Sequence, residues 1–114
     1  METMAVPDIA HYTYRVTWSV EDQEFVATCI EFPSLSWLAE SQVSALEGLE
    51  ALIADTIEDM HSEGEDIPQP LSERTYSGKF SLRVGETLHR RLAVEAAEEN
   101  VSINQLIVRA LSRL

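Results

Sequence analysis

Hydrophobic residues alternate with polar ones over residues 11–20, in the period of two that is typical of a half-buried β-strand. A short polar turn and a second β-rich run over residues 24–31 predict a β-hairpin, and a third strand is expected over residues 35–40. From Ser41, a suitable N-cap, hydrophobic positions recur at helical spacing until Gly64, a plausible C-terminal stop. The pattern predicts a small three-stranded antiparallel sheet with one long helix across it, an α+β layer.

The pattern then disappears over residues 65–75, which are polar and contain two prolines, and this composition predicts a linker. A fourth strand that starts at Ile67 or Leu71 is the alternative, but the prolines make the segment a poor candidate. We therefore expect an N-terminal domain at residues 1–64 and a C-terminal domain at residues 76–114.

Alternation returns over residues 77–84, where Phe80, Leu82 and Val84 form one apolar face of a predicted strand. The other face carries two cations and a hydroxyl, on Lys79, Ser81 and Arg83.

Two helical patterns follow this strand, over residues 86–99 and 103–114. Asn100 is suited to a left-handed C-cap of the first helix. Ser102 and Gln105 match a capping box at the start of the second helix.

A strand and two short helices are near the lower limit for a chain that folds alone, and a single strand leaves both of its edges unpaired. The expected solution is dimerisation, in which two copies of the strand pair antiparallel and four helices cover the apolar face. Lys79, Ser81 and Arg83 would then project from the far side of the ribbon. A two-stranded ribbon fits the major groove of DNA, so we predict that these three residues contact bases.

Charge supports a different partner for each half of the chain. The whole chain carries a net charge of −12, but residues 76–114 hold six cations against four anions, and residues 1–75 hold two cations against sixteen anions. The basic end can approach phosphate, whereas the acidic end would repel DNA and favour a basic protein. The acidic residues on the long helix are compatible with a solvated helix face or with a dedicated binding surface.

The start of the last predicted helix is a candidate anchor for a DNA phosphate, through the amides of Ser102, Ile103 and Asn104. An ordinary capped helix is the alternative. For Lys79, Ser81 and Arg83 the alternative is the solvated face of an amphipathic strand, but the helices and the charge asymmetry favour base contacts.

Three stretches together resemble the ribbon-helix-helix domain of HicB-type antitoxins of type II toxin–antitoxin systems: residues 78–83, then Leu88-His89, then residues 101–105. Residues 10–64 also resemble the N-terminal domain of that family. The resemblance implies a partial ribonuclease-H-like fold without catalysis, which docks onto a HicA toxin, a small basic ribonuclease that cleaves mRNA. This chain departs from the family at residues 31–37, where a Pro-Gly turn is common, and at Gly85, where a proline commonly follows the strand.

The resemblance thus implies an antitoxin that blocks a HicA-like toxin and represses its own operon as a dimer or a higher-order assembly bound to operator DNA. The alternative is a stand-alone ribbon-helix-helix regulator whose N-terminal domain serves oligomerisation or ligand binding.

An enzyme is not expected, and neither are metals or cofactors. The three histidines lack metal-site spacing, and Glu24 and Glu31 point to opposite faces of one predicted strand. Cys29 is expected to be a buried apolar residue, and Trp18 and Trp37 are expected in the core. The alternative for Trp37, which follows a turn, is that it anchors a partner. One cysteine, no apolar run of membrane-spanning length and an N-terminus without a basic start predict a cytoplasmic protein without a membrane partner.

Overall fold

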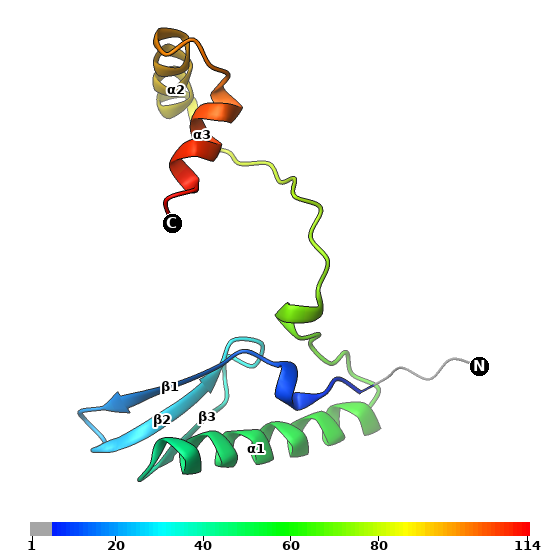
Figure 1. The fold of residues 1–114 in the computed structure, drawn as a ribbon. Helices are drawn as coiled ribbons and strands as arrows, with labels where there is room; N and C mark the ends of the chain where they lie inside the picture. Colours follow the sequence, from blue (N-terminus) through cyan, green and yellow to red (C-terminus); the bar gives the residue numbers. More distant parts are fainter. Residues whose placement is uncertain (1–5) are drawn as a thin grey trace. The chain divides into compact units, whose positions relative to one another are not determined.

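The computed structural model describes residues 6–114 and divides the chain into two units, the first ending at Tyr76 and the second spanning Ser77–Leu114 (Figure 1). The first unit contains, in chain order, the 3₁₀ helix η1 (Ile9–His11), strands β1 (Tyr14–Ser19), β2 (Glu24–Cys29) and β3 (Ser36–Ala39), helix α1 (Gln42–Ser62) and the 3₁₀ helix η2 (Leu71–Glu73). The second unit contains helices α2 (Glu86–Glu98) and α3 (Ile103–Leu111). The elements among the described residues are therefore of the α+β class that the sequence predicts.

The three strands form one antiparallel sheet in the order β1-β2-β3. Tyr14 lies opposite Cys29, and Phe25 lies opposite Ala39, so the predicted hairpin and third strand are confirmed with slightly shorter bounds. Gln23 has a positive φ of 55° in the turn between β1 and β2, and its amide donates to the Ser19 carbonyl at 2.8 Å. This local turn fixes the register of the hairpin.

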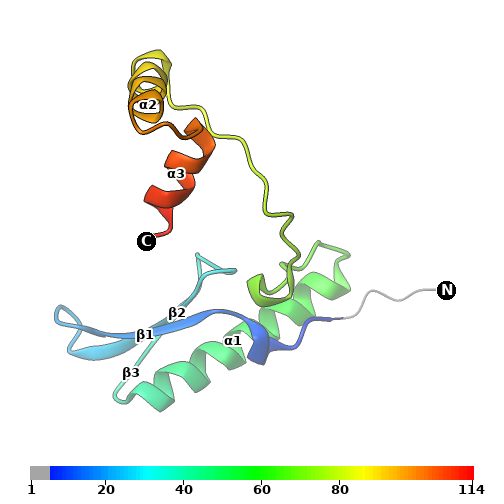
Figure 2. The same cartoon turned by 45° about the horizontal axis from the view of Figure 1, so that its top comes forward.

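Helix α1 packs along one face of the sheet (Figures 1 and 2). The Ser41 hydroxyl accepts from the Ser44 amide at 3.1 Å, and Gly64 has a φ of +71° just after the helix, so the predicted N-cap and stop are confirmed. Buried residues of both layers form one core: Tyr12, Ala27, Cys29, Phe32, Ala45, Leu49, Ile53 and Ile57. The prediction of a buried Cys29 is thereby confirmed.

The two tryptophans are not core residues, and that prediction is wrong. Trp18 is 48% exposed and Trp37 is 43% exposed. Trp18 packs edge-on against Phe25, with ring centroids 5.0 Å apart. Trp37 lies against Gly48 of α1 so closely that a Cβ there would come within 2.0 Å of its indole nitrogen. Both rings therefore cover the margin of the core, because the narrow sheet and single helix leave them partly open to solvent.

The predicted linker, residues 65–75, packs against the first unit over part of its length. Pro70 is fully buried, and Ile67 is partly buried against the core. The segment forms η2 rather than the alternative fourth strand. Its contacts reach residues 11–12 and 31, which are far away in the sequence.

In the second unit, the two predicted helices are confirmed, and so are the caps between them. Asn100 has a φ of 57°, as expected of a left-handed residue after α2. The Ser102 hydroxyl accepts from the Gln105 amide, and the Gln105 side chain accepts from the Ser102 amide, both at 2.9 Å. The intermolecular ribbon and the ribonuclease-H-like likeness of the first unit stay predictions.

Candidate nucleic-acid interface and apolar groove

Residues 79–84 form no strand pairing with any other residue in the described range 6–114. Gly78 and Gly85, with φ values of +83° and +82°, stand at the two ends of this segment. Because L-residues avoid this region, the glycines allow sharp changes of chain direction on either side. Residues 79–84 are thus delimited at both ends and lack an intramolecular strand partner.

The three predicted base-contacting side chains, on Lys79, Ser81 and Arg83, are all exposed. They form no side-chain hydrogen bond or ion pair among those found within residues 6–114. The local restraints are with Ser77, whose hydroxyl accepts from the Lys79 amide at 3.1 Å and donates to the Lys79 carbonyl at 3.2 Å. The side-chain donors of Lys79, Ser81 and Arg83 are therefore available to a ligand, as they would also be on the solvated face of an amphipathic strand.

The apolar residues of the same segment are also uncovered. Phe80 is 76% exposed and Leu82 is 60% exposed, whereas Val84 is half-buried. Large side chains at alternate positions of a strand are normally buried on one side.

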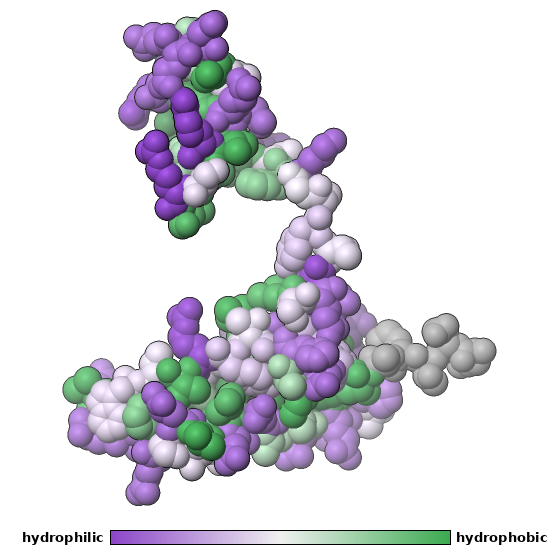
Figure 3. Space-filling view, in the orientation of Figure 1, coloured by the Kyte–Doolittle hydropathy of each residue, from purple (hydrophilic) through white to green (hydrophobic). Residues whose placement is uncertain are grey.

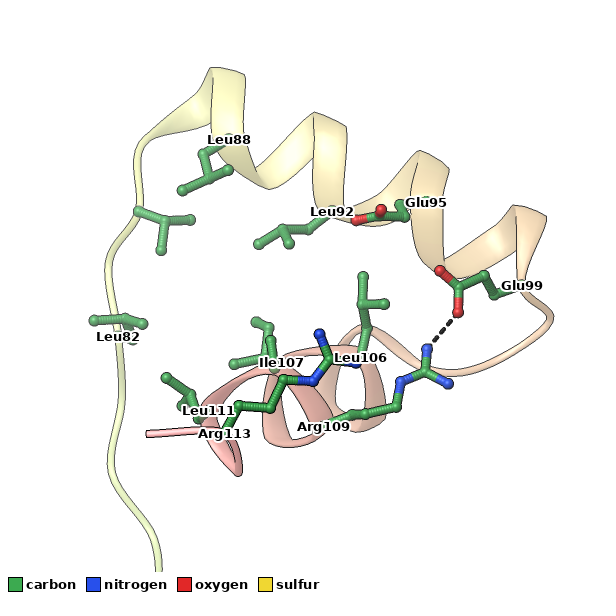
Figure 4. A pocket seen from close by; sticks show the side chains of 12 residues that line it. Leu82, Leu88, Leu92, Glu95, Glu99, Leu106, Ile107, Arg109, Leu111 and Arg113 are labelled. Atoms are coloured by element: carbon green, nitrogen blue, oxygen red, sulfur yellow. Dashed lines mark hydrogen bonds and ion pairs between the residues drawn. The ribbon is translucent and has the colours of Figure 1, made fainter.

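An apolar groove of about 540 Å³ opens between this segment and the two helices (Figure 4). Figure 4 shows Leu88 and Leu92 of α2 pointing towards Ile107 and Leu111 of α3, with Leu82 beside them. Only Ala96 and Leu106 are buried among the hydrophobic residues of the second unit. Hydrophobic side chains accordingly appear at the surface of this unit in Figure 3. The second unit thus has enough hydrophobic residues for a core, but most of them stay exposed to solvent in a single copy.

Four charged residues also line the groove: Glu95, Glu99, Arg109 and Arg113. Glu99 accepts a charge-assisted hydrogen bond from Arg109, so the end of α2 is tied to α3 across the turn between them. Both partners are about half exposed, so this pair contributes little to stability and serves chiefly to orient the helices.

The start of α3, the candidate phosphate anchor, already uses one of its three amides within the protein. The amide of Ser102 donates to Gln105 in the capping box, which leaves the amides of Ile103 and Asn104 without an intrahelical acceptor. The Ser102 amide is therefore not free, because the capping box uses it. The assignment of all three residues as phosphate contacts stays a prediction.

In the first unit, the sequence did not reveal the role of Glu31. Its side chain is about 9% exposed and accepts hydrogen bonds from the Thr13 amide at 2.9 Å and the Leu71 amide at 2.9 Å. Burial by itself would raise the pKa of Glu31, but the N–H donors of Leu71 and Thr13 outweigh it and lower the pKa to about 2. The carboxylate is therefore ionised at neutral pH and fully engaged in structure, and its only sequence signal was a polar residue at a strand end.

Within residues 6–114, no three histidine, cysteine or acidic side chains are arranged to hold a metal ion. No helix in the same range is both long and apolar enough to cross a membrane.

A comparison with protein families matches the HicB family over residues 61–111. This match supports a HicB-type protein and suggests an antitoxin-like function. It covers part of α1, the segment up to Tyr76 and nearly all of the second unit, and it leaves the sheet outside. No curated protein and no solved structure matches the chain.

Proposed function

We propose that this chain is an antitoxin that works as a dimer: the second unit reads operator DNA as a ribbon-helix-helix, and the acidic first unit covers a basic ribonuclease of the HicA type. Both activities work by blocking access: the second unit would cover a promoter, and the first unit would cover the active site of a nuclease. No catalytic residue is needed for either activity.

The observation that carries the proposal is the uncovered apolar surface of the second unit. A domain of under about 40 residues rarely folds alone without metals or disulfides, and this one leaves Phe80 and Leu82 in solvent. Pairing residues 79–84 of two copies would satisfy their free backbone groups and bring four helices over one apolar layer. The glycines at both ends of the segment suit such a ribbon.

DNA reading follows from what the ribbon would leave on its other face. Lys79, Ser81 and Arg83 alternate with the apolar residues, so both copies would present them to a major groove together. The Ile103 and Asn104 amides at the start of α3 can bind a phosphate and set the depth of the ribbon in the groove.

Arg83→Ala tests the DNA contact. The variant should bind the DNA upstream of its own gene with a specific affinity lower by about 1–3 kcal/mol, or roughly fivefold to 150-fold, because a base contact is lost. Arg15→Ala removes the same charge from the first unit and should leave the affinity unchanged. Equal gel-shift affinities of the Arg83 variant and the wild type would contradict base reading.

Charge supports the toxin half of the proposal. Sixteen anions against two cations over residues 1–75 suit a basic partner, because opposite charges accelerate and direct association. A tagged copy expressed from its own locus should therefore co-purify with a small basic protein in stoichiometric amount.

The bounds of the family match favour one second candidate, a stand-alone regulator, because the match does not extend over the sheet. In that case the co-purification should yield only the chain itself, while the DNA complex still forms at low salt.

A further inference from the structure

We propose that residues 67–73 form a strap that can open without unfolding of the first unit, and that the carboxylate of Glu31 is its latch. This inference concerns the first unit alone and depends on neither DNA nor a toxin.

The strap is joined to the start of the sheet by four polar contacts. The Tyr12 hydroxyl donates to the Pro68 carbonyl at 2.7 Å, and the Leu71 amide donates to Glu31 at 2.9 Å. The Ser72 hydroxyl donates to the His11 carbonyl at 3.1 Å, and the His11 ring is hydrogen-bonded to Glu73. Three of the four contacts are made by residues 11–12 and the fourth by Glu31, which is itself hydrogen-bonded to the Thr13 amide, so one small region holds the whole strap.

Glu31 is the central contact because it joins three parts of the unit. One oxygen accepts from the Thr13 amide, at 2.9 Å, and from the Cys29 thiol, at 3.4 Å. The other accepts from the Leu71 amide and from the Thr13 hydroxyl, at 3.1 Å. An ionised carboxylate with N–H donors makes some of the stronger hydrogen bonds in proteins. A glutamine at this position offers one acceptor oxygen only, and its NH₂ group would face a donor.

Two side chains of the strap pack on the core, since Pro70 is fully buried and Ile67 is partly buried, and the remainder of the strap is weakly fixed. It has no strand pairing, and η2 contains two internal backbone bonds, from Glu73 to Pro70 and from Arg74 to Leu71. Ser72 and Glu73 are exposed, and the two contacts that they make are at the surface. Segments with few buried contacts and exposed hydrogen bonds are those that open locally while the core stays folded.

Opening would change the length of free chain ahead of Lys79. With the strap closed, Arg74 is still hydrogen-bonded to it, and the chain is unattached over residues 75–78, which span at most about 14 Å. With the strap open, the last attached residue is Glu65, and the chain is unattached over residues 66–78, which span at most about 45 Å. The latch thus sets how far residues 79–84 can extend from the first unit.

Hydrogen exchange of the full chain tests the strap. In the wild type, the strap amides should be less protected than amides in the buried part of α1, such as those of Leu49 and Ile53. In Glu31→Gln, exchange at the strap should accelerate at least tenfold, while exchange in α1 changes by less than about twofold. The strap amides to follow are those of Leu71, Glu73 and Arg74.

Glu21→Gln is the matched control, because it makes the same change of charge at an exposed turn and should leave the strap unaffected. If Glu31→Gln unfolds the unit, Tyr12→Phe removes the contact with Pro68 but keeps the ring in the core, and it should accelerate exchange at the strap alone. Equal protection of the strap and α1 in the wild type would overturn the proposal. Equal acceleration of the strap and α1 in either variant would also overturn it.

Discussion

The two units of this chain differ in how far they bury their hydrophobic residues. The first unit has a sheet and a helix that bury a continuous core of eight residues, and Ala27, Ala45, Leu49 and Ile53 are completely inaccessible. In the second unit, two hydrophobic residues are buried, while Phe80, Leu82 and Val108 are more than half exposed. The first unit buries its core within a single copy, whereas the second leaves most of its hydrophobic residues uncovered.

This difference shows that an exposed hydrophobic side chain has to be interpreted differently in the two units. Val20 is 73% exposed at the hairpin turn of the first unit, and single exposed hydrophobic residues of this kind need no explanation. Leu82 is 60% exposed beside an apolar groove, and a contiguous apolar surface marks an interface. Substitutions at comparably exposed positions can therefore separate the two cases.

Leu82→Asp should have the largest effect, because it places two charges in the middle of the proposed ribbon. We expect the dimer to be lost, so that the mass measured by analytical ultracentrifugation falls to that of one chain. Val20→Asp is the control, and it should leave the mass unchanged. A dimeric Leu82→Asp protein would show that the second unit does not associate through this face.

Ile53→Ala should destabilise the first unit by about 2–5 kcal/mol, since it leaves a cavity in a fully buried site. Chemical denaturation followed by the fluorescence of Trp18 and Trp37, both of which lie in this unit, measures the change. Val43→Ala, at a residue of the same helix that is 65% exposed, should change the stability by less than about 0.5 kcal/mol. A small effect at Ile53 would show that the first unit is not held by its own core.

The elements that the sequence predicted correctly depend on local signals. Ser41, Gly64, Asn100 and the Ser102–Gln105 pair are all cap residues, and each acts on groups within a few residues of itself. The register of the hairpin follows from alternation and a short turn in the same way. Local chemistry therefore fixed the element boundaries to within a few residues.

The features that the sequence missed depend on distant partners. The role of Glu31 requires Leu71, 40 positions later, and neither residue carries a pattern that indicates the other. The exposure of Trp18 and Trp37 depends on how much of the sheet a single helix covers, which composition does not reveal. The ribbon is an extreme case, because the partner predicted for residues 79–84 lies in another chain.

Ser102→Ala should weaken the second unit by about 0.5–2 kcal/mol, because it removes the hydroxyl that caps α3. Thermal denaturation followed by helical circular dichroism measures the loss. Ser112→Ala is a control at the other end of the same helix, where the hydroxyl donates to the Val108 carbonyl at 2.7 Å and caps no free amide. If the two substitutions lowered the stability equally, the capping box would contribute no more to this unit than the Ser112 hydroxyl does.

The smallest effect should be the pH dependence that His11 gives to the first unit. The hydrogen bond to Glu73 raises the pKa of His11, and Asp8, 3.7 Å from the ring, acts in the same direction. A raised pKa in the folded state means that protonated His11 stabilises the unit below its unfolded pKa, and that this contribution is lost as the pH rises through the folded pKa. The difference in unfolding free energy between the wild type and His11→Gln should therefore be larger at pH 5.5 than at pH 8.5. In a Glu73→Gln background the same substitution should show little of this dependence, because the partner that holds the proton is gone. A pH dependence of equal size in both backgrounds would assign the effect to Asp8, and the strap would then carry no charge-assisted contact at its surface.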